Sequence, residues 1–371
     1  MRYVSELKNK DLSGEVCLLR VDLNIDPEQA RYSPRISSII PTIRFFTERN
    51  AKVVLLSHRG RPKGFDQKRL SLRPFAKILA VKLRSRVYFF PTFDFARLRK
   101  KIDSLEAGGI ILAENLRFVT GEERNSSSFA KQLAEVGTLY VNEAFAVSHR
   151  ADASVVAVVK FLPSYAGLLL EQEIRNLSAV MRRPRKPLVV ISGGAKVLTK
   201  IGLIRNFLKS ADLFLVGGAM ANTFLKAAGE DIGDSLWEKA SLAEAKRLLR
   251  TGKIVIPVDT AMKGGQILDI GKRTRKLFAQ RLTGAKTVIW NGPLGYIEDD
   301  RFARGTRYVI RCVAASQAFS VVGGGETVEL IEKMGFTKKF GFVSTGGGAM
   351  LEFLSGRKLP GIEALNSSIV R

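Results

Sequence analysis

The feature that most constrains the fold is an alternation that repeats along the chain. Short aliphatic and β-branched runs alternate with stretches whose apolar residues recur at helical spacing, such as 40–49 and 241–250. Apolar strands separated by amphipathic helices are typical of parallel sheets that helices cover on both faces. The alternation therefore predicts an α/β protein. Ten runs are predicted strands: 16–23, 52–58, 109–115, 139–145, 188–194, 213–218, 254–259, 287–292, 319–325 and 340–348.

The two halves of the chain differ in the residues at the ends of their strands. A chain of 371 residues is long enough for about two domains. The strand-like runs of the first half end in Asp, Asn, Arg and His, whereas those of the second half end in glycines and lysines. Ligands of open α/β sheets bind at the carboxyl ends of the strands, so each half is predicted to hold its own site. Between them, 161–187 reads as a long helix with a proline-punctuated basic end, and we predict a rigid connector with a hinge at each end.

Composition narrows the class of protein. Hydrophobic residues make up 46% of the chain and charged residues 26%, which is globular, and no apolar run approaches the roughly 18 residues that span a bilayer. The N-terminus lacks the apolar core of a secretory signal, so we expect a soluble cytoplasmic protein. Cys17 and Cys312 lie inside apolar segments and are expected to be free thiols rather than a disulfide or a metal site.

The net charge is unusual, at +25 with a pI near 10.2. Such a field attracts polyanions, so nucleic acids and phosphorylated metabolites are both candidate ligands. The densest basic clusters, at 98–101, 182–186 and 272–276, are short and scattered. We interpret them as solvated faces, with non-specific attraction of nucleic acid as a side effect.

Loops after the strands of the first half collect cationic and hydrogen-bonding side chains. A single arginine in such a place is usually solvated, and a lone histidine is more often a core or capping group than a catalyst. Four loops that each carry Arg or His are harder to explain in that way, because guanidinium groups suit phosphate and carboxylate oxygens. They predict a site for an acidic phosphorylated substrate, although Arg59 alone fits the solvated interpretation well. The candidates are Asp22, Asn24, Arg35, His58, Arg59, Arg61, Arg117, His149 and Arg150.

The strand ends of the second half carry glycines and lysines. Lys196 and Lys200 lie four apart at a strand-to-helix junction, hence on one helix face, and helix N-termini at such junctions attract anions. The sequence contains neither GxxxxGK[ST] nor GxGxxG, so the pattern indicates a nucleotide site built from backbone outside those motifs. The two halves together predict a two-domain phosphate enzyme. The glycine-bearing strand ends are 193–194, 217–218, 291–295, 323–325 and 346–348.

Longer motifs carry a resemblance to the phosphoglycerate kinase family. The chain resembles that family from about residue 15 to the C-terminus, and two of the motifs, WNGPLG and STGGGAMLEFLSG, are rarely seen elsewhere. The resemblance implies a monomeric glycolytic enzyme. It would transfer a phosphoryl group reversibly between 1,3-bisphosphoglycerate and ADP, giving 3-phosphoglycerate and ATP, with Mg²⁺ and by direct in-line transfer on hinge closure. The motifs, in the family's order, are RVDLN, SHRGRPKG, ENLRF, VNEAFAVSHRADAS, GGAKVLTKI, GGAMANTFL, WNGPLGYIE, GGGETV and STGGGAMLEFLSG.

The resemblance also implies a fold and its division along the chain. The fold comprises two Rossmann-like three-layer α/β domains with parallel sheets, joined by a long interdomain helix. The expected parts are a 3-phosphoglycerate-binding domain at 1–165, the interdomain helix and hinge at 166–186, a nucleotide-binding domain at 187–350, and a C-terminal segment at 351–371 that returns to the N-terminal domain.

Site residues follow from the resemblance position by position. Arg35 and Lys196 are the expected catalytic residues. Glu326, in the loop VGGGETVE, is expected to serve Mg²⁺ directly or through a water, where relatives usually carry the shorter Asp. The expected 3-phosphoglycerate ligands are Asp22, Asn24, Arg35, His58, Arg61, Arg117 and Arg150. The expected ATP/ADP ligands are Gly194, Lys196, Lys200, Gly217, Gly218, Leu236, Leu268, Asn291, Glu298, Gly324, Gly325, Glu326 and Thr327.

The implied chemistry agrees with the residues present. The attacking carboxylate is already ionised at neutral pH and needs no general base, so the work left to the protein is positioning and charge neutralisation. The chain departs from the family's usual pattern at Glu143, Ala146 and Tyr296. Two alternatives stay open: a related kinase for another acidic phosphorylated substrate, and a divergent or inactive scaffold that binds polyanions such as nucleic acid.

Overall fold

The computed structural model describes residues 1–371 except 32, 63–66, 196 and 369–371, and it divides into two compact units. Unit 1 comprises Met1–Ile174 and the segment that begins at Lys358, and unit 2 comprises Arg175–Arg357. The division falls inside helix α8 (Leu168–Arg182). The boundaries expected at 165, 186 and 350 stay a prediction.

Unit 1 is built around a six-stranded parallel sheet in the order β3-β4-β2-β1-β5-β6. Leu19 in the central strand is in register with Leu55 on one side and Val141 on the other. The four inner strands confirm predicted strands, whereas the two edge strands are absent from the predicted set. The strands are β1 (Val16–Arg20), β2 (Lys52–Leu56), β3 (Val87–Phe90), β4 (Ile110–Ala113), β5 (Leu139–Asn142) and β6 (Ser164–Ala166).

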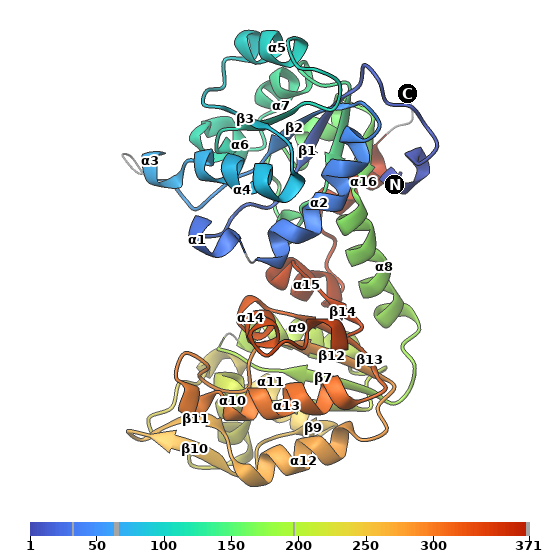
Figure 1. Cartoon of the computed structure of the whole chain (residues 1–371). Coiled ribbons are helices and arrows are strands. Elements are labelled where there is room, and N and C mark those ends of the chain that lie inside the picture. Colours follow the sequence, from blue (N-terminus) through green and yellow to red (C-terminus); the bar gives the residue numbers. More distant parts are fainter. Residues whose placement is uncertain (32, 63–66, 196, 369–371) are drawn as a thin grey trace. The chain divides into compact units, whose positions relative to one another are not determined.

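Helices cover both faces of the unit 1 sheet (Figure 1). On one face, α2 (Pro34–Thr47) and α4 (Arg73–Leu83) bury apolar residues spaced three or four apart against alternate residues of the strands. The other face carries α5 (Phe95–Asp103) and α7 (Ser127–Ala134). The shorter elements are η1 (Val4–Leu7), α1 (Pro27–Ala30), α3 (Gln67–Leu70), η3 (Leu116–Phe118), α6 (Thr120–Glu123), η4 (Phe145–Val147) and η5 (Ala157–Lys160).

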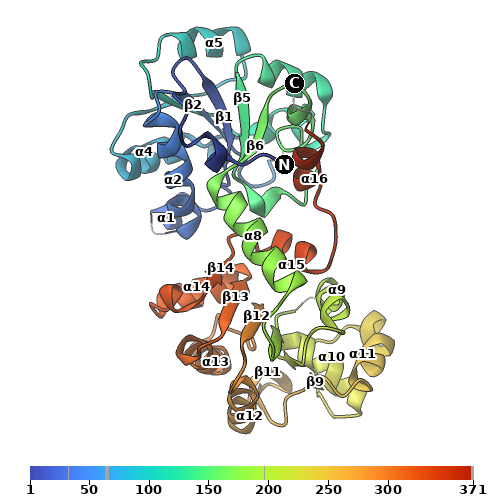
Figure 2. The same cartoon turned by 90° about the vertical axis from the view of Figure 1, so that its right-hand side faces the viewer.

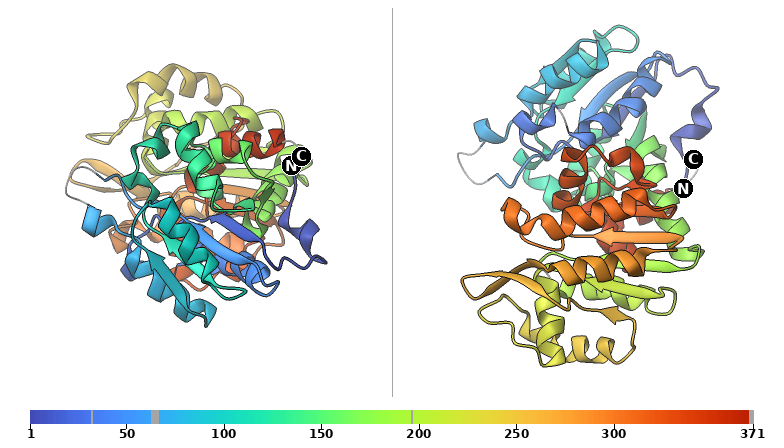
Figure 3. Two further views of the ribbon diagram at one scale, coloured as in Figure 1. Left: turned by 90° about the horizontal axis from the view of Figure 1, so that it is seen from above. Right: turned by 60° about the horizontal axis from the view of Figure 1, so that its bottom comes forward.

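The chain's last helix, α16 (Pro360–Ser367), belongs to unit 1 and lies beside β6 and η5 (Figure 2 and Figure 3). The Gly361 N–H donates to the Ser148 carbonyl at 2.8 Å. A Cβ at Gly361 would lie 2.7 Å from Val155, so the close approach of this helix requires a glycine.

Unit 2 holds a second six-stranded parallel sheet, in the order β14-β13-β12-β7-β8-β9. All six strands confirm predicted strands. An antiparallel hairpin of β10 and β11 was not predicted; its turn contains Gly264 and Gly265, both with positive φ, as tight hairpin turns require. The strands are β7 (Leu188–Ser192), β8 (Leu213–Val216), β9 (Ile254–Val255), β10 (Thr260–Lys263), β11 (Gln266–Ile270), β12 (Thr287–Asn291), β13 (Phe319–Gly323) and β14 (Phe342–Val343).

The unit 2 sheet also lies between two helical layers (Figure 2). Trp290 of β12 is fully buried in a core to which three helices on one face contribute: α12 (Lys272–Leu282), α13 (Arg304–Ala315) and α14 (Gly325–Lys333). The other face carries α9 (Val197–Phe207), α10 (Gly218–Ala228), α11 (Leu242–Leu249) and α15 (Gly347–Leu354). The remaining short helices are η6 (Lys239–Ser241), η7 (Asp300–Phe302) and η8 (Thr337–Lys339).

Two expectations from composition can be compared with the structure. Cys17 and Cys312 are free thiols, as predicted, with Cys17 buried and Cys312 half-buried. Within the described ranges, no helix combines the length and the apolar character needed to cross a membrane.

The segment 161–187 is a helix over only part of its length, which corrects the prediction. Residues 164–166 form strand β6, and α8 begins at Leu168. The change occurs at Gly167, where a Cβ would overlap the carboxyl group of Glu143. That carboxyl group accepts hydrogen bonds from the Leu169 N–H at 3.0 and 3.1 Å and from the Leu170 N–H at 3.4 Å. It satisfies backbone donors at the start of α8 that have no partner within the helix.

Glu143 makes the stability of the protein depend on pH. Its carboxyl group is fully buried, and burial raises its pKa from 4.5 to about 8 although Thr42 and the α8 amides favour the charged form. Between pH 4.5, the ordinary pKa that applies to the unfolded chain, and about pH 8, the pKa in the folded chain, the folded chain binds more protons. The free energy of unfolding therefore falls as pH rises through this range. We expect Glu143→Gln to remove this dependence, which is on the order of a few kcal/mol. Urea unfolding of both proteins from pH 5 to 8.5 measures it, and a constant difference between them would contradict the assignment.

Candidate functional site

The loop after β1 places Asp22 and Asn24 beside Arg35. The Asn24 N–H donates to Asp22 Oδ1 at 3.0 Å. Arg35 Nη1 donates to Asp22 Oδ2 at 3.4 Å and to the Asn24 carbonyl at 3.2 Å. Arg35 lies in the first turn of α2, which Ser33 caps by accepting the Arg35 N–H. The start of a helix thus holds a guanidinium group next to the carboxyl end of a strand.

His58 follows β2, is fully buried and is held by Arg20. Its Nδ1 lies 3.0 Å from Arg20 Nη2. Because a guanidinium group can only donate, Nδ1 is the acceptor and the ring proton resides on Nε2. Burial, followed by the charges of Arg20, Arg150 and Arg35, lowers the His58 pKa to about 2. The imidazole is therefore neutral, and among the described residues its Nε2–H has no partner. It is a fixed, buried donor whose hydrogen bond the described residues leave unmade.

Arg117 and Arg150 share one carboxylate. Glu123 Oε1 lies 3.1 Å from Arg117 Nη2 and 3.3 Å from Arg150 Nη2, and Asp152 lies 3.4 Å from Arg150 Nε. Burial lowers the pKa of Arg150, and the nearby charges of Arg20 and Arg61 act in the same direction. Two arginines from different loops are therefore brought to one place.

Gly60 connects the loops after β1, β2 and β4. Its carbonyl accepts from Arg117 Nη1, and its N–H donates to Asn24 Oδ1 at 2.8 Å. The segments that carry the seven residues expected to bind the substrate are thus linked to one another. Most are linked by hydrogen bonds or ion pairs, and Arg61 by the effect of its charge on Arg150. Arg59 differs, because its side chain donates to the Arg69 carbonyl at 2.6 Å and approaches Asp26 at 3.9 Å.

Sequence reasoning missed the residues that support His58. Arg20 is fully buried and donates from Nε to Ser154 Oγ at 2.9 Å. Ser154 in turn donates to the buried Glu122 carboxylate at 2.5 Å from its hydroxyl and at 3.0 Å from its N–H. Arg20 and Glu122 also attract one another. The available signal was an arginine inside the apolar run VCLLRV, because a charge in a buried strand needs a buried partner.

In unit 2, the loops after three strands are hydrogen-bonded into a cradle made of backbone. The Gly194 N–H donates to the Pro293 carbonyl at 2.7 Å, and the Gly218 N–H donates to the Leu294 carbonyl at 2.8 Å. The approach is so close that a Cβ at Gly193 would stand 2.0 Å from the Pro293 oxygen. Only glycine fits there, which explains the strand-end glycines after β7 and β12.

The start of α14 adjoins this cradle. Gly324 adopts φ +103°, and a Cβ on it would lie 3.3 Å from the Gly292 nitrogen. A Cβ on Gly325 would meet nothing within 4 Å, so the backbone there faces open space. Glu326 is exposed in the first helical turn, and the fully buried Thr327 hydroxyl has no partner among the described residues. The loop therefore presents an open helix N-terminus with an acid beside it.

Lys200 is the cation of this cradle. It is buried, and its Nζ donates to the Gly193 carbonyl. Burial lowers its pKa to about 8, while the negative charge of Glu326 acts in the opposite direction. Asn291, also buried, ends β12 next to the same loops. Lys196 lies outside the described residues, so its expected position cannot be compared.

The residues expected at the adenine come from adjoining segments. The Ile267 N–H donates to Ser235 Oγ at 2.8 Å, which places the residues next to Leu236 and Leu268 side by side. The Tyr296 N–H donates to the Leu268 carbonyl at 2.7 Å. Leu236 and Tyr296 are 73% and 51% exposed, which leaves apolar surface open to a flat ligand. Glu298 is exposed two residues after Tyr296.

Mg²⁺ fits this arrangement as a partner of the nucleotide. Among the described residues, no group of three or more His, Cys, Asp or Glu side chains could hold a metal ion by itself. Glu326 supplies one exposed carboxylate beside the open backbone loop. Mg²⁺ commonly binds through one or two carboxylates together with substrate phosphates and water.

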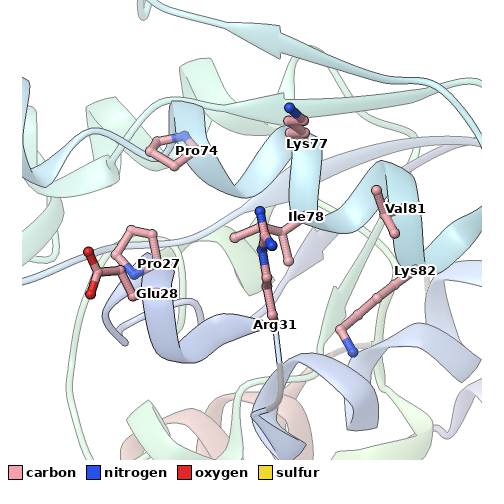
Figure 4. Close-up of a pocket in the computed structure, with 8 residues that line it drawn as sticks. All are labelled: Pro27, Glu28, Arg31, Pro74, Lys77, Ile78, Val81 and Lys82. Atoms are coloured by element: carbon pink, nitrogen blue, oxygen red, sulfur yellow. The ribbon is translucent and has the colours of Figure 1, made fainter.

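A cavity of about 830 Å³ lies apart from all of these residues, between α1 and α4 (Figure 4). Its apolar lining includes Pro27, Ile78 and Val81, and none of the predicted site residues lines it. The size of the cavity is therefore no guide to the candidate site.

Comparison with known proteins agrees with this geometry. The phosphoglycerate kinase family model matches residues 7–357. The chain is 42% identical to phosphoglycerate kinase of Herpetosiphon aurantiacus, over 95% of this chain and 97% of the relative, and 43% identical to that of Rubrobacter xylanophilus, over 97% of each. Solved phosphoglycerate kinases of Pyrococcus horikoshii and Coxiella burnetii superpose with TM-scores of 0.89 and 0.83, at 32% and 37% identity. They cover 99% and 96% of this chain, and the chain covers 99% and 97% of theirs.

The fold and the two sites define a class of two-unit α/β proteins that pair an anion-binding cluster with a glycine-built cradle. The chain belongs to the phosphoglycerate kinase family.

The buried pair of Arg20 and Glu122 generates a prediction about stability. Arg20→Met leaves the Glu122 carboxylate buried without its countercharge, so we expect the free energy of unfolding to fall by about 3–5 kcal/mol. Arg20→Met combined with Glu122→Gln removes both charges and is expected to regain most of that loss. Urea denaturation of the three proteins at pH 7 measures the effect. A double variant no more stable than Arg20→Met would show that the two charges do not compensate one another.

Proposed function

We propose that this chain is a phosphoglycerate kinase. It transfers a phosphoryl group reversibly between 1,3-bisphosphoglycerate and ADP, with Mg²⁺, as a monomer in the cytoplasm. The observation that carries the proposal is the presence of two different sites at strand ends in a chain of this family. Guanidinium groups surround a neutral His58 in unit 1, and glycine loops surround Lys200 in unit 2.

The unit 1 site suits 3-phosphoglycerate, which carries a phosphate and a carboxylate. The neutral His58 donates one directed hydrogen bond without changing charge between pH 5 and 8. Arg117 and Arg150 supply forked donors and are held in place by Glu123 until a ligand arrives. Asp22 and Asn24 orient Arg35 and leave it partly exposed. The substrate's carboxylate is already ionised and attacks the phosphoryl group without a base.

The unit 2 site suits ATP or ADP. The phosphates would accept hydrogen bonds from the open backbone at the start of α14, at Gly325, and would keep Lys200 charged. Leu236 and Leu268 would contact the adenine, and Glu298 the ribose. Glu326 would hold Mg²⁺ together with the phosphates, and the ion would supply positive charge at the transferring group.

Transfer requires the two substrates to meet, and we propose that hinge closure accomplishes this. Arg35 and Lys196 are the proposed groups that neutralise charge on the transferring phosphoryl group. The role of Lys196 rests on the resemblance alone. The overall proposal is tested by coupled turnover of ATP and 3-phosphoglycerate with Mg²⁺ and with a chelator. A folded sample that does not turn over ATP and 3-phosphoglycerate would favour the inactive scaffold. Membership of the family does not favour that alternative.

Arg35→Ala tests the unit 1 assignment. Loss of an arginine that stabilises a transferring phosphoryl group is expected to lower kcat by roughly 10³–10⁵. Arg44→Ala is a matched control, because Arg44 lies on the same helix in its last turn and donates to the Lys82 carbonyl. Steady-state kinetics should leave Arg44→Ala near the parent. Near-normal turnover of Arg35→Ala would refute the role.

Glu326→Gln tests the metal assignment. Gln keeps the size of the side chain and removes its charge, so we expect the Mg²⁺ concentration for half-maximal activity to rise by about tenfold or more. Glu329→Gln is the control, because Glu329 lies on the same helix but pairs with Lys333 at 2.7 Å. Titration of activity with Mg²⁺ at fixed ATP measures both variants. If they respond alike, Glu326 only starts the helix.

A further inference from the structure

One segment of unit 1 combines positive charge with aromatic rings and takes no part in the proposed reaction. Residues 84–101 contain six Lys and Arg, five aromatic residues and one acid. The segment forms the edge strand β3, which pairs on one side with β4, and the following helix α5 (Figure 1). The four residues of β3 are all half-buried, in contrast to the fully buried inner strands. Its aromatic residues are therefore partly open to solvent.

Cations from three elements lie over the rings of β3. Arg86, just before the strand, lies 4.4 Å from the centre of the Tyr88 ring, and Lys101 of α5 lies 4.2 Å from the same centre. Arg73 of α4 lies 4.7 Å from the Phe89 ring centre. Such contacts fix long cationic side chains that would otherwise be mobile. Two positive charges are thus held at one ring.

A cavity of about 390 Å³ lies between β3 and α5, a size within the range of small-ligand sites. Three aromatic residues and three cations are among its lining residues, and no acid is. Because successive strand residues point to opposite faces, the rings of Tyr88 and Phe90 face α5, whereas that of Phe89 packs on the α4 side. The lining residues are Tyr88, Phe89, Phe90, Arg97, Lys100, Lys101, Ser104 and Ile111.

Ion pairs among the described residues leave the positive charge of this face uncompensated. Among the described residues, no acidic side chain forms an ion pair with the five cations on or beside the face. This contrasts with Arg117 and Arg150, which share Glu123. Uncompensated like charges repel one another, and a polyanion relieves that repulsion. The five cations are Arg86, before β3, and Arg97, Arg99, Lys100 and Lys101 of α5, of which Arg97, Lys100 and Lys101 line the cavity.

The face is separate from the proposed substrate site. Arg86 precedes β3, and Lys100 and Lys101 lie in the last turn of α5, so they stand toward the amino ends of the parallel strands. The substrate residues follow the carboxyl ends of the neighbouring strands. A ligand on this face would therefore leave turnover unaffected.

We infer that the face formed by β3 and α5 binds single-stranded nucleic acid. Proteins that bind single strands without sequence preference combine a positive groove, which follows the phosphates, with aromatic rings on which bases stack. Here Arg86, Arg97, Lys100 and Lys101 supply the phosphate contacts, and the cavity beside the rings of Tyr88 and Phe90 receives a base. A duplex, whose bases are stacked internally, could use only the charges.

The test is fluorescence anisotropy with a labelled oligouridine of about 15 nucleotides, at physiological salt, with the full-length protein. Lys100→Gln/Lys101→Gln is expected to weaken binding at least tenfold and to reduce the slope of log affinity against log salt by about 1.4, because two phosphate contacts are lost. Tyr88→Leu keeps the net charge and is expected to weaken binding roughly tenfold through loss of the ring. Both variants should keep the parent's kinase activity and melting temperature.

Lys272→Gln/Lys276→Gln is the matched control. It removes two exposed lysines from α12 in unit 2, and so makes the same change in net charge. We expect this variant to bind the oligouridine nearly as tightly as the parent. We also expect an unlabelled duplex of equal length to displace little of the oligouridine from the parent. Four results would each overturn the inference. The two lysine pairs could lose affinity equally, or Tyr88→Leu could bind as the parent does. The duplex could compete as well as the single strand, or the parent could fail to bind at physiological salt.

Discussion

Both candidate sites depend on the parallel pairing of strands. In a parallel sheet every strand ends at the same edge, so residues far apart in sequence are delivered together. Leu19 pairs with Leu55 and with Val141, and the chain beyond these three positions supplies Asp22, His58 and Arg150 to the unit 1 site. In unit 2 the same pairing brings glycine loops into direct backbone contact. The chemistry differs between the units only in which residues come after the strands.

The sequence predicted the strands that have long aliphatic or glycine-ended runs and missed those that do not. Runs such as LVVIS of β7 are apolar throughout because helices cover both sides. The short run VYFF of β3 is aromatic and lies between basic residues, β6 has only three residues, and β10 and β11 interrupt their apolar residues with Lys, Gln and Asp. The start of α8 was misplaced for a related reason. Periodicity in the sequence continues across Gly167, whereas the backbone changes direction there.

The candidate site could be predicted as a set of residues but not as a network. The resemblance to the family identified the individual residues. Their position after the strands of a parallel sheet predicted that they would lie together. The support of His58 could not be read in advance, because Arg20 and Ser154 are 134 residues apart and their contact exists only in the folded chain. The neutral state of His58 follows from that contact and from burial, neither of which sequence spacing reveals.

The shared carboxylate of Glu123 changes how the affinity of unit 1 for anions should be understood. Arg117 and Arg150 are already partnered, so an incoming phosphate or carboxylate displaces an internal partner instead of meeting bare charge. The binding free energy is then the difference between that of the arginines with the ligand and that of the arginines with Glu123. In the empty site, the Glu123 carboxylate reduces the repulsion between the two guanidinium groups. It also favours product release, because it lies within reach of both arginines and can replace the departing anion.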